Sequence, residues 1–261
     1  MTTNPSSPQG EPPASRRVAA ALRALIESGE LSPGDVLPSE RGLSEQFGVA
    51  RNTAREAVRL LADEGLVIAK HGKGVFVREE PRLLRFGSER YSQKIREETG
   101  LSPYRAEVSK QGRTARVDCT SITRVPAPAL VAERLFLPTE SEVARRENWY
   151  YADDEPVQCG VTYIPWHIAQ GSVLGDSANL GPGSLYARFD ELGYPIKVIR
   201  EEISARMPRI SEKEALKIPD GVPVIEVIHT GINHEGTPFE VTIFTMRADT
   251  NGLDYTIPVE D

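Results

Sequence analysis

The sequence has little cysteine and no long apolar run, and each of these shortages excludes a class of protein. Only two of its 261 residues are cysteines, Cys119 and Cys159, and neither belongs to a CxxC pair, so a zinc ribbon or a disulfide framework is not expected. No stretch approaches the roughly 20 apolar residues of a membrane span, and the N-terminus lacks the order of a signal peptide. We therefore expect a cytoplasmic location, no membrane partner, no metal and no cofactor.

Positive charge is scarce over the whole chain but not in its N-terminal part. The formal net charge is −7, which taken alone disfavours a nucleic-acid partner. Residues 16–78, however, carry ten Lys/Arg against eight Asp/Glu, whereas residues 79–261 carry 21 against 29. Because a DNA-facing surface needs local positive charge, this division favours a nucleic-acid contact in the N-terminal part.

Composition divides the chain into four segments. Residues 1–15 are rich in Pro, Ser and Gly and nearly free of apolar side chains, so a disordered tail is predicted. Residues 16–78 form a compact N-terminal unit, residues 79–100 a linker, and residues 101–261 a larger C-terminal unit.

The N-terminal unit has the pattern of three helices followed by a hairpin. The first helix starts at Arg16 and ends near Gly29, and the second runs from Glu40 to Phe47 behind the capping residue Ser39. Buried positions at helical spacing mark the third helix: Ala54, Ala57, Val58 and Leu61. The β-prone runs "LVIAK" and "VFV" then flank "HGKG". This order predicts a winged helix-turn-helix.

The third helix carries the most informative surface. Arg51, Arg55 and Arg59 are four residues apart and share one side of the helix, with Asn52 and Thr53 at its N-terminal end. Arginine can bind guanine or phosphate and asparagine can bind adenine, so this face suits the major groove. The alternative is a solvated arginine face paired with Glu56 and Asp63. The short helix before it and the hairpin after it favour DNA.

The segment "LSPGDVLPSERGLSEQFGVARNTAREAVRLLADEGLVIAKHGKGVFV" resembles the DNA-binding domain of the GntR family of bacterial transcription regulators. The resemblance implies DNA contacts at Arg41, Arg51, Asn52, Thr53, Arg55, His71, Gly72 and Lys73. The glycine pair Gly72 and Gly74 is then the tip of a wing that faces the minor groove, and not a dinucleotide site, for which the third glycine is missing. Ala50 replaces a common Ser, which removes a possible helix cap.

The C-terminal unit has the pattern of an antiparallel sheet with short helices, so the fold class is α+β. Six β-prone runs lie within residues 113–125, 141–151, 156–165, 196–207, 223–233 and 238–246. Helical spacing is present in residues 126–136, 183–193 and 211–218.

Four segments of this unit resemble the HutC subfamily, whose UTRA effector domain is similar in fold to chorismate lyase: "ADDEPVQCGVTYIP", "GSLYARFDELGYP", "EEISARMPRISEKEALKI" and "HEGTPFEVTIFTMRAD". The resemblance implies a pocket for a small polar metabolite at Ser184, Tyr186 and Glu240. Asn148 and Tyr150 stand where many members have an Arg-x-Arg pair, and His229 stands where Arg is common. Fewer arginines weaken the expectation of a phosphorylated sugar.

Several alternatives remain open at the level of sequence. Tyr150 and Tyr186 could fill the core, Glu240 could be an ordinary ion-pair partner, and His229 with His234 could bind a metal. The protein could also be a constitutive repressor with a degenerate pocket, or a lyase-like enzyme, although no catalytic motif is visible. The favoured interpretation is a homodimeric, ligand-responsive transcriptional regulator, a repressor that binds an inverted repeat and is not an enzyme.

Overall fold

The computed structural model describes residues 11–70, 72–78, 83–87, 89–92, 94 and 98–257. The chain forms two compact units, and the larger one holds most of the chain after residue 80. Within the described residues, no helix combines the length and apolar character needed to cross a membrane.

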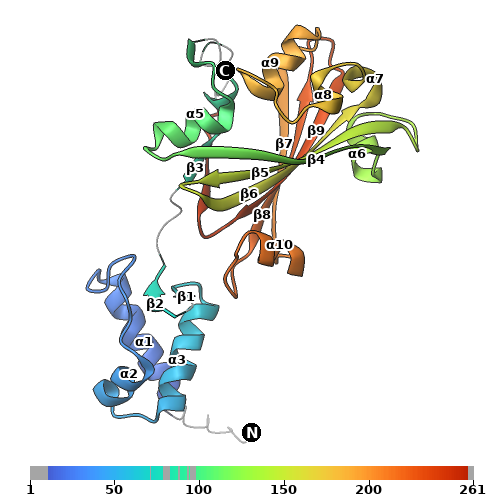
Figure 1. Cartoon of the computed structure of the whole chain (residues 1–261). Helices are drawn as coiled ribbons and strands as arrows, with labels where there is room; N and C mark the ends of the chain where they lie inside the picture. Colours follow the sequence, from blue (N-terminus) through green and yellow to red (C-terminus); the bar gives the residue numbers. More distant parts are fainter. Residues whose placement is uncertain are drawn as a thin grey trace, which may run out of the picture. The chain divides into compact units, whose positions relative to one another are not determined.

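The N-terminal unit has the three helices and the hairpin that the sequence predicts (Figure 1). Its elements are α1 (Ala14–Glu27), α2 (Glu40–Phe47), α3 (Arg51–Asp63), β1 (Val67–Lys70) and β2 (Gly74–Val77). Helix α1 begins two residues earlier than predicted, because the carbonyl of Pro13 already accepts hydrogen bonds from the backbone N–H groups of Arg16 and Arg17 at 2.8 and 3.1 Å. The core of the N-terminal unit contains Leu22, Leu43, Ala57 and Leu61, which are at most 1% exposed.

The caps of α2 and α3 differ as their sequences predict. The Ser39 side chain accepts a hydrogen bond from the Gly42 N–H at 3.1 Å, and Gly48 ends α2 in the left-handed region at φ 63°. Helix α3 has no side-chain hydrogen bond at its N-cap, Ala50. The tight connection therefore presents the start of α3 with unshielded backbone N–H groups.

The hairpin pairs β1 with β2 in antiparallel register, with Lys70 opposite Gly74. At its tip Gly72 has a φ of 69°, a conformation that glycine adopts without strain, and the Lys73 N–H donates to the Lys70 carbonyl at 2.9 Å. His71 lies outside the described residues. The hairpin thus has the tight tip of a wing.

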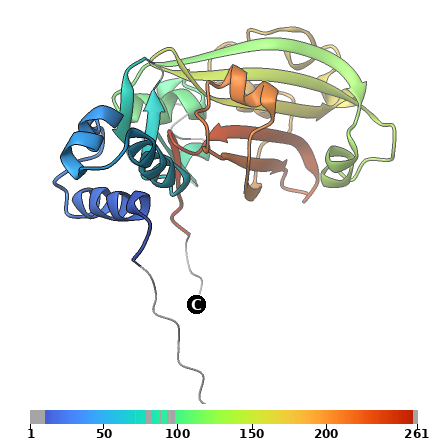
Figure 2. The ribbon, with the colours of Figure 1, turned by 90° about the horizontal axis from the view of Figure 1, so that it is seen from below.

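The C-terminal unit is built on one six-stranded antiparallel sheet with the order β4-β5-β6-β9-β8-β7. Its strands are β4 (Ala115–Pro126), β5 (Glu142–Ala152), β6 (Glu155–Pro165), β7 (Val198–Arg206), β8 (Val224–Ile232) and β9 (Pro238–Arg247). Figure 2 shows the long strands β4 and β5 running side by side, with α6 (Ala129–Arg134) at one end of the pair. The α+β fold class is confirmed.

The part of this unit that the structure describes also contains α5 (Pro103–Lys110), α7 (Trp166–Ala169), α8 (Val173–Asp176), α9 (Ser184–Glu191) and α10 (Ile210–Ala215). Helices α7, α8 and α9 gather at one end of the sheet (Figure 1). Phe189 of α9 packs against Phe239 in a buried cluster that includes Ile164. The short 3-10 helix η1 (Glu89–Tyr91) precedes α5 along the chain. A second, two-stranded sheet pairs β3 (Leu83–Phe86) in parallel with β10 (Asn251–Asp254). The sequence patterns did not predict α5, α7, α8 or the β3–β10 pair.

Candidate DNA-binding and effector-binding sites

The start of α3 presents a charged surface whose arginines differ in their partners. Arg51 and Asn52 are exposed, Thr53 is half-buried, and Arg51 forms no ion pair with any described residue. Arg55 instead donates two hydrogen bonds to the Glu40 carboxylate of α2, at 2.8 and 2.9 Å. These bonds lower the pKa of Glu40. Arg51 is therefore available to a phosphate or a base, whereas Nε and Nη2 of Arg55 are already bonded to Glu40.

Two other arginines of this unit are paired on its surface. Arg59 contacts Glu56 and Asp63, each at 2.8 Å, which is the pairing that the solvated-face alternative predicts for this helix. Arg41 pairs with Glu45 at 2.8 Å, and both side chains are exposed. Exposed pairs of this kind contribute little to stability and exchange readily for a phosphate partner.

The wing adds an exposed cation. Gly72 and Lys73 are both exposed, and a Cβ built on Gly72 would meet no heavy atom within 4 Å. The backbone at the tip can therefore approach another molecule closely.

A cavity of about 730 Å³ opens in the C-terminal unit where two helices start. Residues 100–105, at the start of α5, and residues 181–183, at the start of α9, form part of its wall. A hydrogen bond of 2.9 Å from the Gly183 N–H to the Gly100 carbonyl joins these two segments. Since the N-terminal end of a helix carries partial positive charge, both helices favour an anion in the cavity.

The remaining wall of the cavity combines charged and aromatic side chains. The described charged residues are Arg90, Arg105, Arg146 and Asp118. The aromatic residues are Tyr104, Tyr150, Tyr186 and Phe244. Three arginines against one aspartate give the cavity a positive potential, and the rings give it flat apolar surfaces.

The residues that the family resemblance implied for effector binding divide into three groups. Asn148, Tyr150 and Tyr186 line the cavity. His229 and Glu240 do not appear in its wall: both are fully buried, and His229 Nε2 lies 2.8 Å from Glu240 Oε1. Ser184 begins α9, but its side chain lies outside what the structure describes. The ion-pair alternative for Glu240 is therefore the arrangement in the structure.

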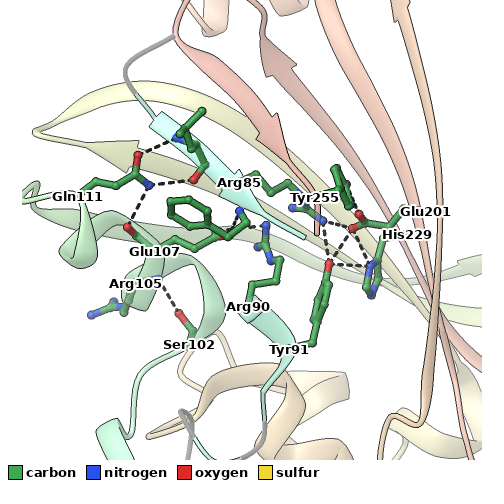
Figure 3. Close-up of polar contacts among 12 residues, drawn as sticks. Arg85, Arg90, Tyr91, Ser102, Arg105, Glu107, Gln111, Glu201, His229 and Tyr255 are labelled. Carbon is green, nitrogen blue, oxygen red and sulfur yellow. Dashed lines mark hydrogen bonds and ion pairs between the residues drawn. The ribbon is translucent and has the colours of Figure 1, made fainter. Parts of the chain in front are cut away.

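His229 belongs to a cluster of polar side chains, and Figure 3 shows Tyr91, Arg85 and Tyr255 pointing towards Glu201 beside it. Its Nδ1 lies 3.3 Å from Glu201 Oε1 and 3.1 Å from the Tyr91 hydroxyl, opposite the Glu240 contact. Arg85 forms an ion pair with Glu201, to which Tyr91 and Tyr255 also donate hydrogen bonds. Two cations thus face two carboxylates inside the domain.

The charges of this cluster shift one another's protonation. Burial alone would lower the pKa of His229, but Glu240 and Glu201 outweigh it, so this pKa is raised. Burial alone would raise the pKa of Glu201, but His229, Arg85 and the tyrosine hydroxyls hold it well below its usual range. His229 and Glu201 therefore each favour the charged form of the other.

Hydrogen bonds connect this cluster to the cavity. The Tyr186 hydroxyl lies 3.4 Å from His229 Nε2, and Thr242 donates to Glu240 Oε2 at 2.9 Å. Thr162 bonds Thr242 at 2.8 Å, and all three of Tyr186, Thr162 and Thr242 line the cavity. A ligand in the cavity would therefore touch the groups that hold Glu240 in place.

His229 and His234 do not form the metal pair considered from the sequence. His229 is buried, whereas the His234 side chain is 66% exposed. Among the described residues, no group of three or more His, Cys, Asp and Glu side chains could hold a metal ion.

Sequence reasoning did not predict the arginines of the cavity or Tyr104. These residues come from η1, α5 and β5, which are distant in sequence. One local signal was available: "SPYRAEV" has Ser102 as a capping residue and Pro103 at the first helical position, and the Ser102 hydroxyl accepts from the Arg105 N–H at 3.4 Å.

Comparison with known proteins agrees with both units. Residues 110–250 match the family described as the UTRA domain, and residues 14–77 match the bacterial regulatory proteins of the gntR family. The chain belongs to the GntR family, in the UTRA-containing HutC subfamily. It is therefore a DNA-binding transcriptional regulator whose C-terminal domain is an effector domain.

Relatives resemble this regulator along nearly its whole length. The HTH-type transcriptional repressor NagR of Bacillus subtilis is 27% identical over 250 residues, which cover 95% of each chain. The HTH-type transcriptional regulator GgaR of Escherichia coli is 26% identical, covering 89% of this chain and 86% of GgaR. The crystal structure of a GntR-family transcriptional regulator matches with a TM-score of 0.68 at 25% identity, covering 95% of this chain and 99% of that one. PhnF from Mycobacterium smegmatis shares the fold, with a TM-score of 0.58 at 21% identity, covering 93% of this chain and all of PhnF.

Proposed function

We propose that this regulator is a homodimeric repressor that binds an inverted-repeat operator and changes its DNA affinity when a small anionic metabolite occupies the cavity of its effector domain. It acts in the cytoplasm and catalyses no reaction. NagR, which is similar over 95% of the chain, is named a transcriptional repressor, and this name supports the direction of control.

The positive cavity is the observation that carries the effector proposal. Two helix starts and three arginines line it. Arg105 and Arg146 form no ion pair with a described residue, whereas Arg90 pairs with Glu107 at 3.2 Å. A carboxylate or phosphate group would therefore supply the negative charge that this wall lacks.

This wall also speaks against a degenerate pocket. Asn148 and Tyr150 lack the arginine pair common in the family, but Arg146 precedes them on the same strand, β5, and lines the same cavity. Strand β5 thus still places a cation, Arg146, in the wall of the cavity.

Residues 83–91, the first described residues of the C-terminal unit, supply the proposed route from ligand to DNA. Arg90 lines the cavity, while its neighbour Tyr91 contacts His229, and Arg85 pairs with Glu201. A ligand that moves Arg90 would therefore also displace the contacts that fix this segment. Such coupling requires the ligand to bind two arrangements of the protein with different affinity.

Operator binding tests the DNA-facing surface. We propose that Arg51, Asn52, Thr53 and Arg55 enter the major groove, with Arg41 on the flanking backbone and His71, Gly72 and Lys73 at the wing. Arg51→Ala should weaken operator binding by about 1–3 kcal/mol, because an unpaired arginine at the start of α3 loses a base or phosphate contact. Fluorescence anisotropy at fixed salt measures the loss.

Arg59→Ala is the matched control on the same helix. Arg59 is already held by Glu56 and Asp63, so its removal should change operator affinity far less than removal of Arg51. Equal losses in the two variants would contradict the proposed groove contact, because a general loss of positive charge would then explain both.

Exposed apolar residues at one edge of the sheet support the dimer. Strand β7 is an edge strand, and Val198 and Ile203 on it are 52% and 46% exposed. Met207 and Ile210, which follow it, are 61% and 79% exposed. We propose that a second copy of the chain covers this edge, and light scattering without DNA should give twice the chain mass of 28.7 kDa.

A further inference from the structure

The two cysteines of the regulator lie in different environments. Cys119 lies on β4 and lines the cavity, next to a shift in the pairing between β4 and β5. Cys159 lies on β6 and is not among the cavity residues. Burial raises the pKa of Cys159 to about 11, so this side chain stays a thiol at neutral pH. Only Cys119 can therefore meet a molecule that enters the cavity.

A buried cation stands beside Cys119. Arg146 is 1% exposed, and one of its terminal nitrogens lies 3.9 Å from the Cys119 sulfur. Its guanidinium donates to the carbonyls of Leu174 and Ser177 at 2.6 and 2.8 Å, but it forms no ion pair with a described residue. Its charge therefore attracts anions into the cavity, where the Cys119 thiol donates to the Ser121 carbonyl at 3.8 Å.

An independent feature of the same wall indicates a ligand with acceptor oxygens. Tyr104 is only 4% exposed and lines the cavity, yet its hydroxyl has no hydrogen-bond partner in the described part of the chain. The same holds for Nε of Arg90, another cavity residue. A buried donor without a partner is costly, so a carboxylate placed here would satisfy groups that the protein leaves unpaired.

We propose that Cys119 is a site of covalent modification by small anionic electrophiles of the α,β-unsaturated carboxylic acid class. The Cys119 thiol gives its proton to water as its sulfur attacks the β-carbon, and a sulfur–carbon bond forms as the carbon–carbon π bond breaks. The electron pair moves to the α-carbon, which takes a proton from water. The step needs no oxidant, and the carboxylate of the adduct stays in the cavity whose wall includes Arg146, Arg90 and Tyr104. The consequence for DNA binding rests on the proposed function, but the reaction does not.

Monomethyl fumarate and dimethyl fumarate provide a matched pair of probes, because the first carries a carboxylate and the second is its neutral ester. The full-length native protein is treated with each, and peptide mass mapping locates the adduct. We expect modification of Cys119 and not of Cys159. We measure the ratio of the reaction rate with monomethyl fumarate to the rate with dimethyl fumarate. This ratio should be about tenfold higher for the protein than for glutathione, which corresponds to about 1.4 kcal/mol.

Variants separate the role of Arg146 from that of the fold. Cys119→Ser should abolish the adduct, and Arg146→Gln should remove the preference for the anionic reagent. Arg145→Gln is the control, because Arg145 neighbours Arg146 in sequence but pairs with Glu147 at 2.7 Å and does not line the cavity. If Arg146→Gln fails to fold, the reagent preference of the wild-type protein still decides the question.

Modification of Cys159 at the same rate as Cys119, or no preference for the anionic reagent, would overturn the proposal. Operator titration of the modified protein then measures the regulatory effect, which should be absent in Cys119→Ser. If the unmodified protein binds no operator at all, the proposed function is wrong. Mass mapping then still shows whether Cys119 is the modified residue.

Discussion

A titratable side chain, His229, occupies the centre of the buried cluster, at a position where arginine is common in the family. Arginine would stay charged at every accessible pH, whereas the charge of a histidine can be lost. His229 is fully buried between Glu240 and Glu201, and losing its proton would leave both carboxylates without this partner. The stability of the effector domain should therefore depend on pH through this residue.

The signs of the two pKa shifts fix the pH window. The pKa of His229 is raised, so its contribution to stability is fully present below the unfolded value of about 6.5 and is lost as pH rises through the folded value. The pKa of Glu201 is lowered, so its contribution is present above about 4.3 and is lost as pH falls. The cluster stabilises the domain most between these limits.

His229→Gln tests this dependence. The difference in unfolding free energy between wild type and variant should be largest near pH 6 and shrink towards pH 9, with a slope of at most about 1.4 kcal/mol per pH unit for one proton. Urea unfolding at a series of pH values measures it. His234→Gln is the control, since that side chain is 66% exposed, and a pH dependence equal in both variants would refute the assignment to His229.

At the scale of elements, the strength of the sequence pattern decided what could be predicted. Helices α1 and α3 repeat their apolar positions over 14 and 13 residues, and their buried residues follow that repeat. The six strands of the large sheet have 9 to 12 residues each and are rich in β-prone residues, which is enough to recognise them. Strands β3 and β10 have only four residues each, and the residues that pair are separated by more than half the chain, so no local sequence pattern predicts them. Helix α5 has a capping serine and an N-terminal proline but a weak apolar stripe.

The wing offers a prediction at this scale. Lys73 is exposed at the tip between β1 and β2, where it can neutralise one DNA phosphate. Lys73→Ala should therefore lower the slope of log affinity against log salt by about one unit, with a similar loss on specific and random DNA. Anisotropy titrations over a range of salt concentrations measure the slope.

Lys110→Ala provides the control for the wing. Its ammonium group lies 4.8 Å from the centre of the Phe86 ring in the effector domain, and not in the hairpin. Removing it changes the net charge by the same amount as Lys73→Ala. An equal change of slope in both variants would mean that Lys73 acts only through the overall charge.

At the scale of the whole molecule, the cavity could be predicted only in part. Family resemblance led to Tyr150 and Tyr186, which line it, because motifs place them on recognisable elements. Arg90, Arg146 and Tyr104 reach the same wall from segments whose spatial neighbours are set by the antiparallel sheet and by the start of α5. A cavity assembled by tertiary pairing leaves no spacing in the sequence from which to infer it.

Coupling between cavity and operator makes the last prediction. If a ligand changes operator affinity by some factor, operator DNA must change ligand affinity by the same factor, typically about 5 to 150-fold for 1–3 kcal/mol of coupling. A thermal-shift screen of sugar phosphates and small carboxylates identifies the ligand, and calorimetry gives its affinity with and without operator.

Tyr186→Ala should weaken ligand binding, because Tyr186 lines the cavity and contacts His229. Glu240→Ala should reduce the coupling factor more than the affinity, because Glu240 lies behind the wall and reaches the cavity only through Thr242 and His229. If operator DNA leaves the ligand affinity of the wild-type protein unchanged, the protein is not an allosteric switch for that ligand. If Tyr186→Ala leaves the ligand affinity unchanged, the ligand binds elsewhere.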